Sequence, residues 1–233
     1  MRNLIKLKHF FLSAMVLTNG LAYAQTAAQI DDFTQAAKFD DVSEVRDLLK
    51  AGVSPNAIDP KGNPMLVVAI RDKSMKVIDF LLSNPATDAN LENKYGETPL
   101  MMASIDGELP VVKTLVLNKK VDVNKLGWSP LHYACATGQL EVAQFLVSKG
   151  AKVNALSPSE TTPLMMAVRS GNDQLIKFLL DNGADLQMRN HEGYSAIDVA
   201  ELFNKDDIRD GLKLRWEKLY KQPYPGGPKK APT

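Results

Sequence analysis

The chain has 233 residues, of which 45% are apolar and 24% are charged, and its 28 basic residues nearly balance its 27 acidic ones. This apolar content is enough to bury a substantial core. The only cysteine, Cys135, excludes an internal disulfide and any zinc site built from several cysteines. From Gly211 onward the chain has six basic residues and a single acidic one, Glu217. The repeats that precede Gly211 are therefore acidic. An acidic body argues against nucleic-acid binding, which depends on neutralising phosphates.

The first 24 residues have the three zones of a secretory signal peptide. A basic start reaches to Lys8, residues 10–17 are mostly apolar, and residues 22–24 (Ala-Tyr-Ala) have the small-x-small pattern of a cleavage site. The apolar run is shorter than the about 20 residues that a spanning helix needs. We therefore expect residues 1–24 to be removed, leaving an exported protein with no integral membrane segment, periplasmic or alternatively secreted. The other interpretation is a first helix of the fold.

After the signal, a triplet of a small polar residue, usually a proline, and an aliphatic residue recurs five times. The intervals between successive copies are 35, 31, 33 and 33 residues. The triplets are Asn63-Pro64-Met65, Thr98-Pro99-Leu100, Ser129-Pro130-Leu131, Thr162-Pro163-Leu164 and Ser195-Ala196-Ile197. Residues 33–49 fit the same template as a sixth copy. A period near 33 residues predicts a solenoid in which each unit packs on its neighbours.

The fourth copy shows how one unit should fold. Ser129 is placed to cap a helix that begins with Pro130, whose missing N–H costs nothing in the first turn. This helix should end by Gly138, and a second helix is expected over residues 140–148 before Gly150. Two antiparallel helices and an extended connector therefore make one repeat. Beyond the last repeat, residues 206–220 are expected to form a closing helix.

Two longer motifs of the fourth copy identify the kind of repeat. They are Ser129-Pro130-Leu131-His132-Tyr133-Ala134-Cys135 and Gly150-Ala151-Lys152-Val153-Asn154. Both resemble the ankyrin repeat, and the similarity covers about residues 31–212. The resemblance implies an all-α ankyrin-repeat solenoid of about six helix-turn-helix repeats with short connector fingers, starting near residues 31, 63, 96, 127, 160 and 193. With its signal, the chain resembles the exported, bacterial type of ankyrin-repeat protein.

These features divide the chain into a signal peptide (1–24), a repeat domain (25–212) and a C-terminal part (213–233). That last part should contain the end of the closing helix and a basic, Pro/Gly-rich tail, which we expect to be extended and mobile. Within the repeats, the second copy has two extra residues near Asn84-Pro85 and the third has one near Lys119-Lys120. The connector before Pro130 is short, so its finger should be blunt, with Trp128 at its base.

Few residues suit catalysis or metal binding. The mature chain has two histidines, His132 and His191, and the resemblance implies that His132 bridges neighbouring turns by hydrogen bonds. Cys135 is expected to be a buried, small apolar residue. The pairs Met101-Met102 and Met165-Met166 are expected in the core, because adjacent helical residues point about 100° apart and cannot share one ion. We therefore predict no catalytic residue, no cofactor and no metal site.

The resemblance implies that a partner protein binds on the concave face, formed by the fingers and the first helix of each repeat. The predicted contacts are Tyr95, Glu97, Trp128 and Tyr194 from the fingers, and Ile70, Arg71, Ile105, Asp106 and Arg169 from the helices. The same rows contain Lys61, Lys94, His191, Glu192, Phe39, Thr137, Ser170, Leu202 and Phe203. These rows contain many large apolar and aromatic side chains, and Trp, Tyr and Arg are the residue types favoured at binding hot spots. Alternatively, Trp128 folds back under its finger, and we expect Leu202 and Phe203 to pack beneath the closing helix.

The sequence thus predicts a non-catalytic protein–protein interaction module, an exported ankyrin-repeat binding protein that captures a partner on its concave face. The identity of the partner is not encoded in any motif. The chain is expected to be a monomer without a cofactor. One alternative is association with anionic lipid or wall polymer through the basic tail from Lys213 to Lys230. Another is an enzyme that uses the repeats as a scaffold.

Overall fold

The computed structural model describes residues 25–228, so the predicted signal peptide and the last five residues of the tail lie outside the described part. The described residues form twelve α-helices and one π-helical turn. In chain order these are α1 (Ala27–Lys38), α2 (Val42–Lys50), α3 (Met65–Arg71), α4 (Met75–Ser83), α5 (Pro99–Ile105), α6 (Leu109–Lys113), η1 (Thr114–Asn118), α7 (Pro130–Ala136), α8 (Leu140–Ser148), α9 (Pro163–Ser170), α10 (Asp173–Asp181), α11 (Ala196–Leu202) and α12 (Asp206–Tyr220).

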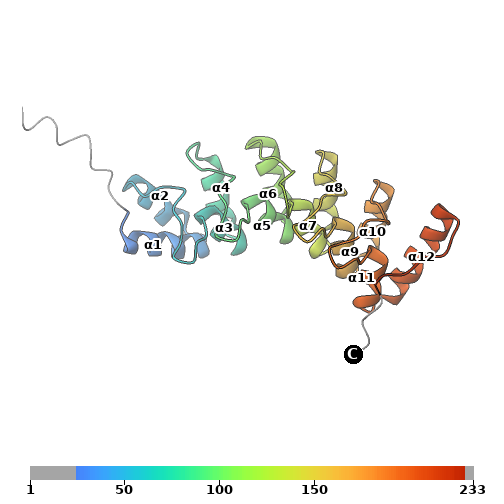
Figure 1. Ribbon diagram of the computed structural model, residues 1–233. Helices are drawn as coiled ribbons and strands as arrows, with labels where there is room; N and C mark the ends of the chain where they lie inside the picture. Colours follow the sequence, from blue (N-terminus) through green and yellow to red (C-terminus); the bar gives the residue numbers. More distant parts are fainter. Residues whose placement is uncertain (1–24, 229–233) are drawn as a thin grey trace, which may run out of the picture.

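The helices pair into six repeats that lie in a single row (Figure 1). The odd-numbered helices form an inner row, in which α5 packs on α7 and α7 on α9. The even-numbered helices form an outer row, in which α2 packs on α4 and α8 on α10. Because each unit packs on its neighbours, the apolar residues form one continuous core along the row. The all-α repeat solenoid predicted from the sequence is confirmed.

The recurring triplet begins the inner helices. α7 starts at Pro130, as the sequence predicts, and α5 and α9 also have a proline in their first turn. Before α5, the side chain of Thr98 accepts a hydrogen bond from the backbone N–H of Met101 at 3.2 Å. This cap satisfies one of the N–H groups that a helix start leaves without a partner. The triplet thus sets the starting point of the inner helices, and α8 covers the expected residues 140–148.

Asparagines in three of the connectors, Asn56, Asn124 and Asn154, clamp one repeat to the next. The side chain of Asn154 donates a hydrogen bond to the carbonyl of Gly183 at 2.8 Å and accepts one from the N–H of Asp185 at 3.0 Å. Asn124 makes the equivalent pair of bonds with Gly150 and Lys152, at 3.0 Å and 2.9 Å. One side chain thereby satisfies both a donor and an acceptor of the next connector, which fixes the spacing between repeats.

The 31-residue interval from Thr98 to Ser129 combines two local features. The one-residue insertion of the third repeat is accommodated by the π-helical turn η1, where the N–H of Lys119 donates to the carbonyl of Thr114 at 3.2 Å. Other fingers are closed by a backbone hydrogen bond across five residues, such as Asn93 to Glu97 at 2.9 Å and Asn190 to Tyr194 at 3.0 Å. Within the described residues the short finger before α7 has no equivalent bond. This finger is the blunt one that the sequence predicts.

The closing helix α12 has the predicted bounds, but part of the tail differs from the expectation. Residues 221–228 have no helix or strand, yet they do not extend freely, because Tyr224 packs edge-on against Trp216 with ring centroids 5.0 Å apart. The guanidinium of Arg189 donates a hydrogen bond to the carbonyl of Gly226 at 3.0 Å. The tail up to Pro228 therefore lies on the sixth repeat rather than extending away from it, because Tyr224 packs on Trp216.

Candidate functional site

Two adjoining hollows lie on the inner helices and fingers of the third to sixth repeats. The first has a volume of about 200 Å³ and is lined mainly by apolar side chains, namely Ile105, Trp128, His132, Tyr133, Ala136 and Met166. The second has a volume of about 270 Å³, and its walls include Trp128, Met166, Arg169, Tyr194, Leu202 and Phe203. Trp128 and Met166 belong to both hollows. The concave face thus carries one apolar groove centred on these two side chains.

Trp128 is held in place by a buried histidine. The two rings meet edge to face, with 5.4 Å between their centroids and 79° between their planes. His132 is fully buried; its Nδ1 accepts a hydrogen bond from the N–H of Ser129 at 3.2 Å, and its Nε2 donates to the carbonyl of Thr161 at 2.9 Å. Burial lowers the pKa of His132, so the ring is neutral near pH 7. The predicted bridging role of His132 is confirmed.

The side of the groove nearer the third repeat is stiffened by a tyrosine and a glutamate. The hydroxyl of Tyr133 donates to one carboxylate oxygen of Glu97 at 3.0 Å, and the side-chain amide of Asn93 donates to the other at 2.7 Å. Burial, followed by these contacts with Glu97, raises the pKa of Tyr133 well above its ordinary value. Glu97, predicted as a partner contact, therefore has both oxygens engaged within the chain and orients Tyr133 beside the first hollow.

The opposite side of the groove contains exposed apolar residues. Leu202 is 43% exposed and Phe203 is 47% exposed, so the expectation that both pack beneath the closing helix is wrong. Their position at the end of α11 turns them toward the groove, where they line the second hollow. The guanidinium of Arg169 lies 5.5 Å from the centre of the Phe203 ring, a cation–π contact. Arg169 thus packs on an aromatic ring within the groove.

Trp128 and Tyr194 are both half-buried and line the groove. Trp128 therefore combines the two predicted alternatives, folding back under its finger and contacting a partner. Its ring packs on His132, and it also lines both hollows. Tyr95 is 73% exposed, and the Nζ atom of Lys94 lies 5.1 Å from the centre of its ring. Tyr95 does not line either hollow.

Of the predicted contact residues on the inner helices, one is buried, one lines a hollow, and two lie outside both hollows. Ile70 is fully buried, so its prediction as a partner contact is wrong; α3 packs between α1 and α5, and this packing encloses it. Ile105 occupies the equivalent place in its repeat and lines the first hollow. Arg71 is exposed, outside both hollows, and lies 3.4 Å from the side-chain oxygen of Asn63. Asp106 is half-buried, and loss of hydration raises the pKa of its carboxyl group.

Sequence reasoning missed Met166 and Tyr133 as parts of the groove. Both occupy the fourth position of an inner helix, as Met102 does in α5, and all three are half-buried. Met166 was assigned to the core together with Met165, but only Met165 is fully enclosed. The repeat spacing could have identified them, because Tyr133 and Met166 are 33 positions apart and residues at that spacing share one face of the solenoid.

The remaining reactive side chains do not converge in the described residues. Cys135 is buried, as expected, and burial raises the pKa of its thiol, which keeps it protonated. Among residues 25–228, no three His, Cys, Asp or Glu side chains are grouped closely enough to hold a metal ion. Each helix in this range is too short or too polar to cross a bilayer.

Comparison with known proteins agrees with this geometry. The sequence profile of ankyrin repeats (3 copies) matches residues 33–126, 66–157 and 110–190. The ankyrin repeat and SAM domain-containing protein 6 of Mus musculus is 29% identical over 174 residues, which cover 73% of this chain and 16% of the mouse protein. The nuclear factor NF-kappa-B p105 subunit of Gallus gallus is 32% identical over 175 residues, covering 72% of this chain and 18% of that protein.

A viral relative matches over most of its length. The putative ankyrin repeat protein FPV230 of Fowlpox virus is 30% identical over 166 residues, covering 68% of this chain and 88% of the viral protein. By contrast, the chain spans less than a fifth of the mouse and chicken relatives. Ankyrin repeats generally mediate protein–protein interactions. The profile match covers more than half of the chain, and together with the paired helices, it shows that this chain belongs to the ankyrin-repeat family.

Proposed function

We propose that this chain is an exported, non-catalytic ankyrin-repeat protein that captures a partner protein in the groove around Trp128 and Met166. The observation that carries the proposal is the pair of adjoining hollows that share these two side chains. An apolar groove with an aromatic centre provides the large contact area that binding hot spots use.

The rigidity of the groove supports this role. Trp128 rests on the buried ring of His132, and Tyr133 is oriented by Glu97. Side chains held in this way lose little conformational freedom when a partner binds, so less of the interaction energy is spent on ordering them. The groove therefore suits a partner segment that inserts one or two apolar side chains beside Trp128.

The rim of the groove favours a partner with basic groups. Glu192 belongs to the wall of the second hollow, and Asp106 follows Ile105 of the first. Because Asp106 has lost part of its hydration, a nearby positive charge on the partner would stabilise its charged form. The acidic charge of the repeats as a whole also speeds the encounter with a basic surface. The partner we propose thus combines an apolar anchor with a neighbouring lysine or arginine.

Export rests on the first 24 residues, which have the zones of a signal peptide and lie outside the described residues. We infer a bacterial envelope location, in the periplasm or outside the cell. Sequencing the amino terminus of the chain recovered from the envelope fraction tests this directly. A terminus at Gln25 supports export, whereas a full-length chain recovered from the cytoplasm contradicts it.

The binding role is tested with a variant of the groove and a control variant outside it. The partner is first isolated by cross-linking and affinity purification from the native envelope, and its dissociation constant is then measured with the purified chain. Replacing Trp128 and Met166 together by alanine should weaken binding tenfold or more. Leu117→Ala is the control, because Leu117 is 42% exposed in the outer row, away from the groove. Equal affinity of the double variant and the control, with both chains folded, would exclude the groove.

A further inference from the structure

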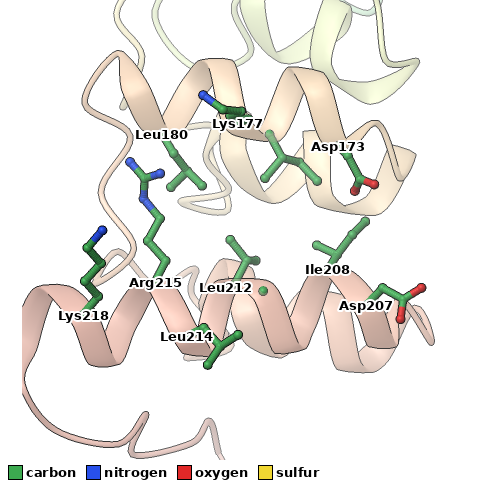
Figure 2. Close-up of a pocket in the computed structure, with 11 residues that line it drawn as sticks. Asp173, Lys177, Leu180, Asp207, Ile208, Leu212, Leu214, Arg215 and Lys218 are labelled. Atoms are coloured by element: carbon green, nitrogen blue, oxygen red, sulfur yellow. The ribbon is translucent and has the colours of Figure 1, made fainter.

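The closing helix α12 has an exposed face that the fold of a single chain does not use. Asp207, Gly211, Leu214 and Lys218 are all exposed, and Leu214 is 69% exposed. Their spacing of four, three and four residues places them in a sector of about 60° on the helix surface, since each residue turns the helix by about 100°. In Figure 2, Ile208 and Leu212 point toward α10, whereas Leu214 points away from it. We call these four residues the α12 stripe.

Gly211 is the least expected member of the stripe. A glycine in the middle of a helix costs about 1 kcal/mol relative to alanine. Most glycines of this chain have a positive φ, which explains their presence, but Gly211 does not. A Cβ atom added to Gly211 would meet nothing within 4 Å, so no neighbour within the chain requires its small size either. At such an open position, the missing side chain permits the close approach of a second molecule.

The order of residues in the stripe is complementary to itself. Read forward it is acid, glycine, leucine, base; an antiparallel copy presents base, leucine, glycine, acid. When Gly211 of one helix faces Leu214 of the other, Asp207 faces Lys218 at both ends. A parallel arrangement would instead place like charges opposite each other. Self-complementarity of one surface is the requirement for a dimer with two-fold symmetry.

We propose that a second copy of this chain binds on the α12 stripe, so that the two α12 helices pack antiparallel about a two-fold axis. Each Leu214 then covers the partner's Gly211, where the missing side chain lets the helices approach closely. Each Asp207 forms an ion pair with the partner's Lys218. Within the described residues neither Asp207 nor Lys218 has an ion pair inside the chain. The neighbouring acids Asp206 and Asp210 are already paired with Arg209.

The surroundings of the stripe add contact area. A groove of about 550 Å³ lies between α10 and α12, with Ile176, Leu180 and Leu212 among its walls and all four stripe residues at its edge (Figure 2). A second α12 placed on the stripe covers this edge. Stable interfaces bury about 1,200–2,000 Å² in total, and one helix pair with such an edge lies at the low end. We therefore expect a dimer that dissociates at micromolar concentrations, in place of the monomer expected from the sequence.

Sedimentation equilibrium of the full chain, over about 1 to 500 µM, tests the dimer. The average mass should rise from that of one chain toward that of two. Asp207→Lys and Lys218→Asp should each weaken association at least tenfold, because each places two like-charged pairs across the axis. The double variant with both reversals restores opposite charges and should dimerise as the natural chain does. All four residues are exposed, so these variants retain the fold, which circular dichroism checks.

Gly211→Gln provides an independent readout, because glutamine forms helices well but is too large for close contact. It should raise the thermal stability of α12 in the isolated chain while abolishing association. A natural chain that stays monomeric at 500 µM overturns the proposal. Association that survives both single reversals and Gly211→Gln overturns it too, since the contact then lies elsewhere. A double reversal that associates no better than the single ones excludes the two-fold pairing.

Discussion

The hydroxyl of Tyr224 donates a hydrogen bond to the carboxylate of Asp198 and thereby holds the C-terminal tail on the sixth repeat. Asp198 occupies the position that His132 has in the fourth repeat, where Nε2 donates to a carbonyl of the following repeat. Pro228 lies against Gly193 as Pro158 lies against Gly127. The tail thus takes the place of the connector finger that a seventh repeat would supply. This contact covers an end of the solenoid that would otherwise be left exposed.

Removing the tyrosine hydroxyl should loosen this end. Tyr224→Phe leaves the nearly buried carboxylate of Asp198 with one donor fewer and should lower the free energy of unfolding by about 1–3 kcal/mol. Tyr220→Phe is the matched control, because the Tyr220 hydroxyl makes no hydrogen bond within the described residues while its ring packs on Trp216. Urea unfolding followed by circular dichroism measures both. Equal stability of the two variants would refute the role of the tail.

Acidification should weaken the central repeats through His132. Burial holds the pKa of His132 below its usual 6.5, so below this pH the unfolded chain binds a proton that the folded chain does not. The stability contributed by the neutral ring is present above pH 6.5 and is lost as the pH falls through the folded-state pKa. Unfolding free energies measured from pH 7.5 to 5 should therefore decrease. His132→Gln should flatten this part of the curve, whereas the exposed His191→Gln should not.

The thiol of Cys135 should react only when the fourth repeat opens. The side chain is fully buried and its pKa is raised, so both access and the reactive thiolate are suppressed. Ellman's reagent should modify the folded chain many times more slowly than the chain in 6 M urea. Trp128→Ala removes the ring that packs on His132 and should accelerate the reaction. Rapid modification of the folded natural chain would contradict the packing of α7.

The asparagine clamps should contribute measurably to the stability of the folded chain. Asn154→Ala removes two hydrogen bonds to the next connector, both near the surface, and should cost about 1 kcal/mol. Gln144→Ala on the exposed face of α8 should change stability by less than about 0.5 kcal/mol. Thermal unfolding of both variants separates the clamp from a general surface effect, and indistinguishable midpoints would argue against the clamp.

The repeat architecture was predictable because the same triplet starts each inner helix from Asn63-Pro64-Met65 onward. Its spacing also located the insertion that becomes η1, although the sequence did not reveal that a π-helical turn would absorb the extra residue. The lining of the groove was less predictable. Ile70 and Ile105 share one repeat position, yet the packing of the first repeats buries Ile70 while Ile105 lines a hollow. Such differences depend on neighbours in space, which a single repeat pattern does not contain.

The backbone conformation of the tail was also predictable from the sequence, whereas its contacts were not. Prolines and glycines after Gln222 predict the absence of regular structure, and residues 223–228 indeed have none. Composition does not reveal that Tyr224 finds Asp198, Ser195 and Trp216 within reach, since these contacts depend on where α12 ends. A local pattern predicts backbone conformation here, whereas docking depends on the arrangement of the sixth repeat.

The most direct test of the binding role places a photoreactive amino acid at two sites of equal exposure. p-Benzoylphenylalanine is introduced at position 202 in the groove, or at position 117 in the outer row, where the natural leucines are 43% and 42% exposed. After illumination of the native envelope, we expect a covalent adduct with one protein at position 202 alone, lost when Trp128→Ala is added. An adduct of equal yield at position 117, or no adduct at position 202, would contradict capture in the groove.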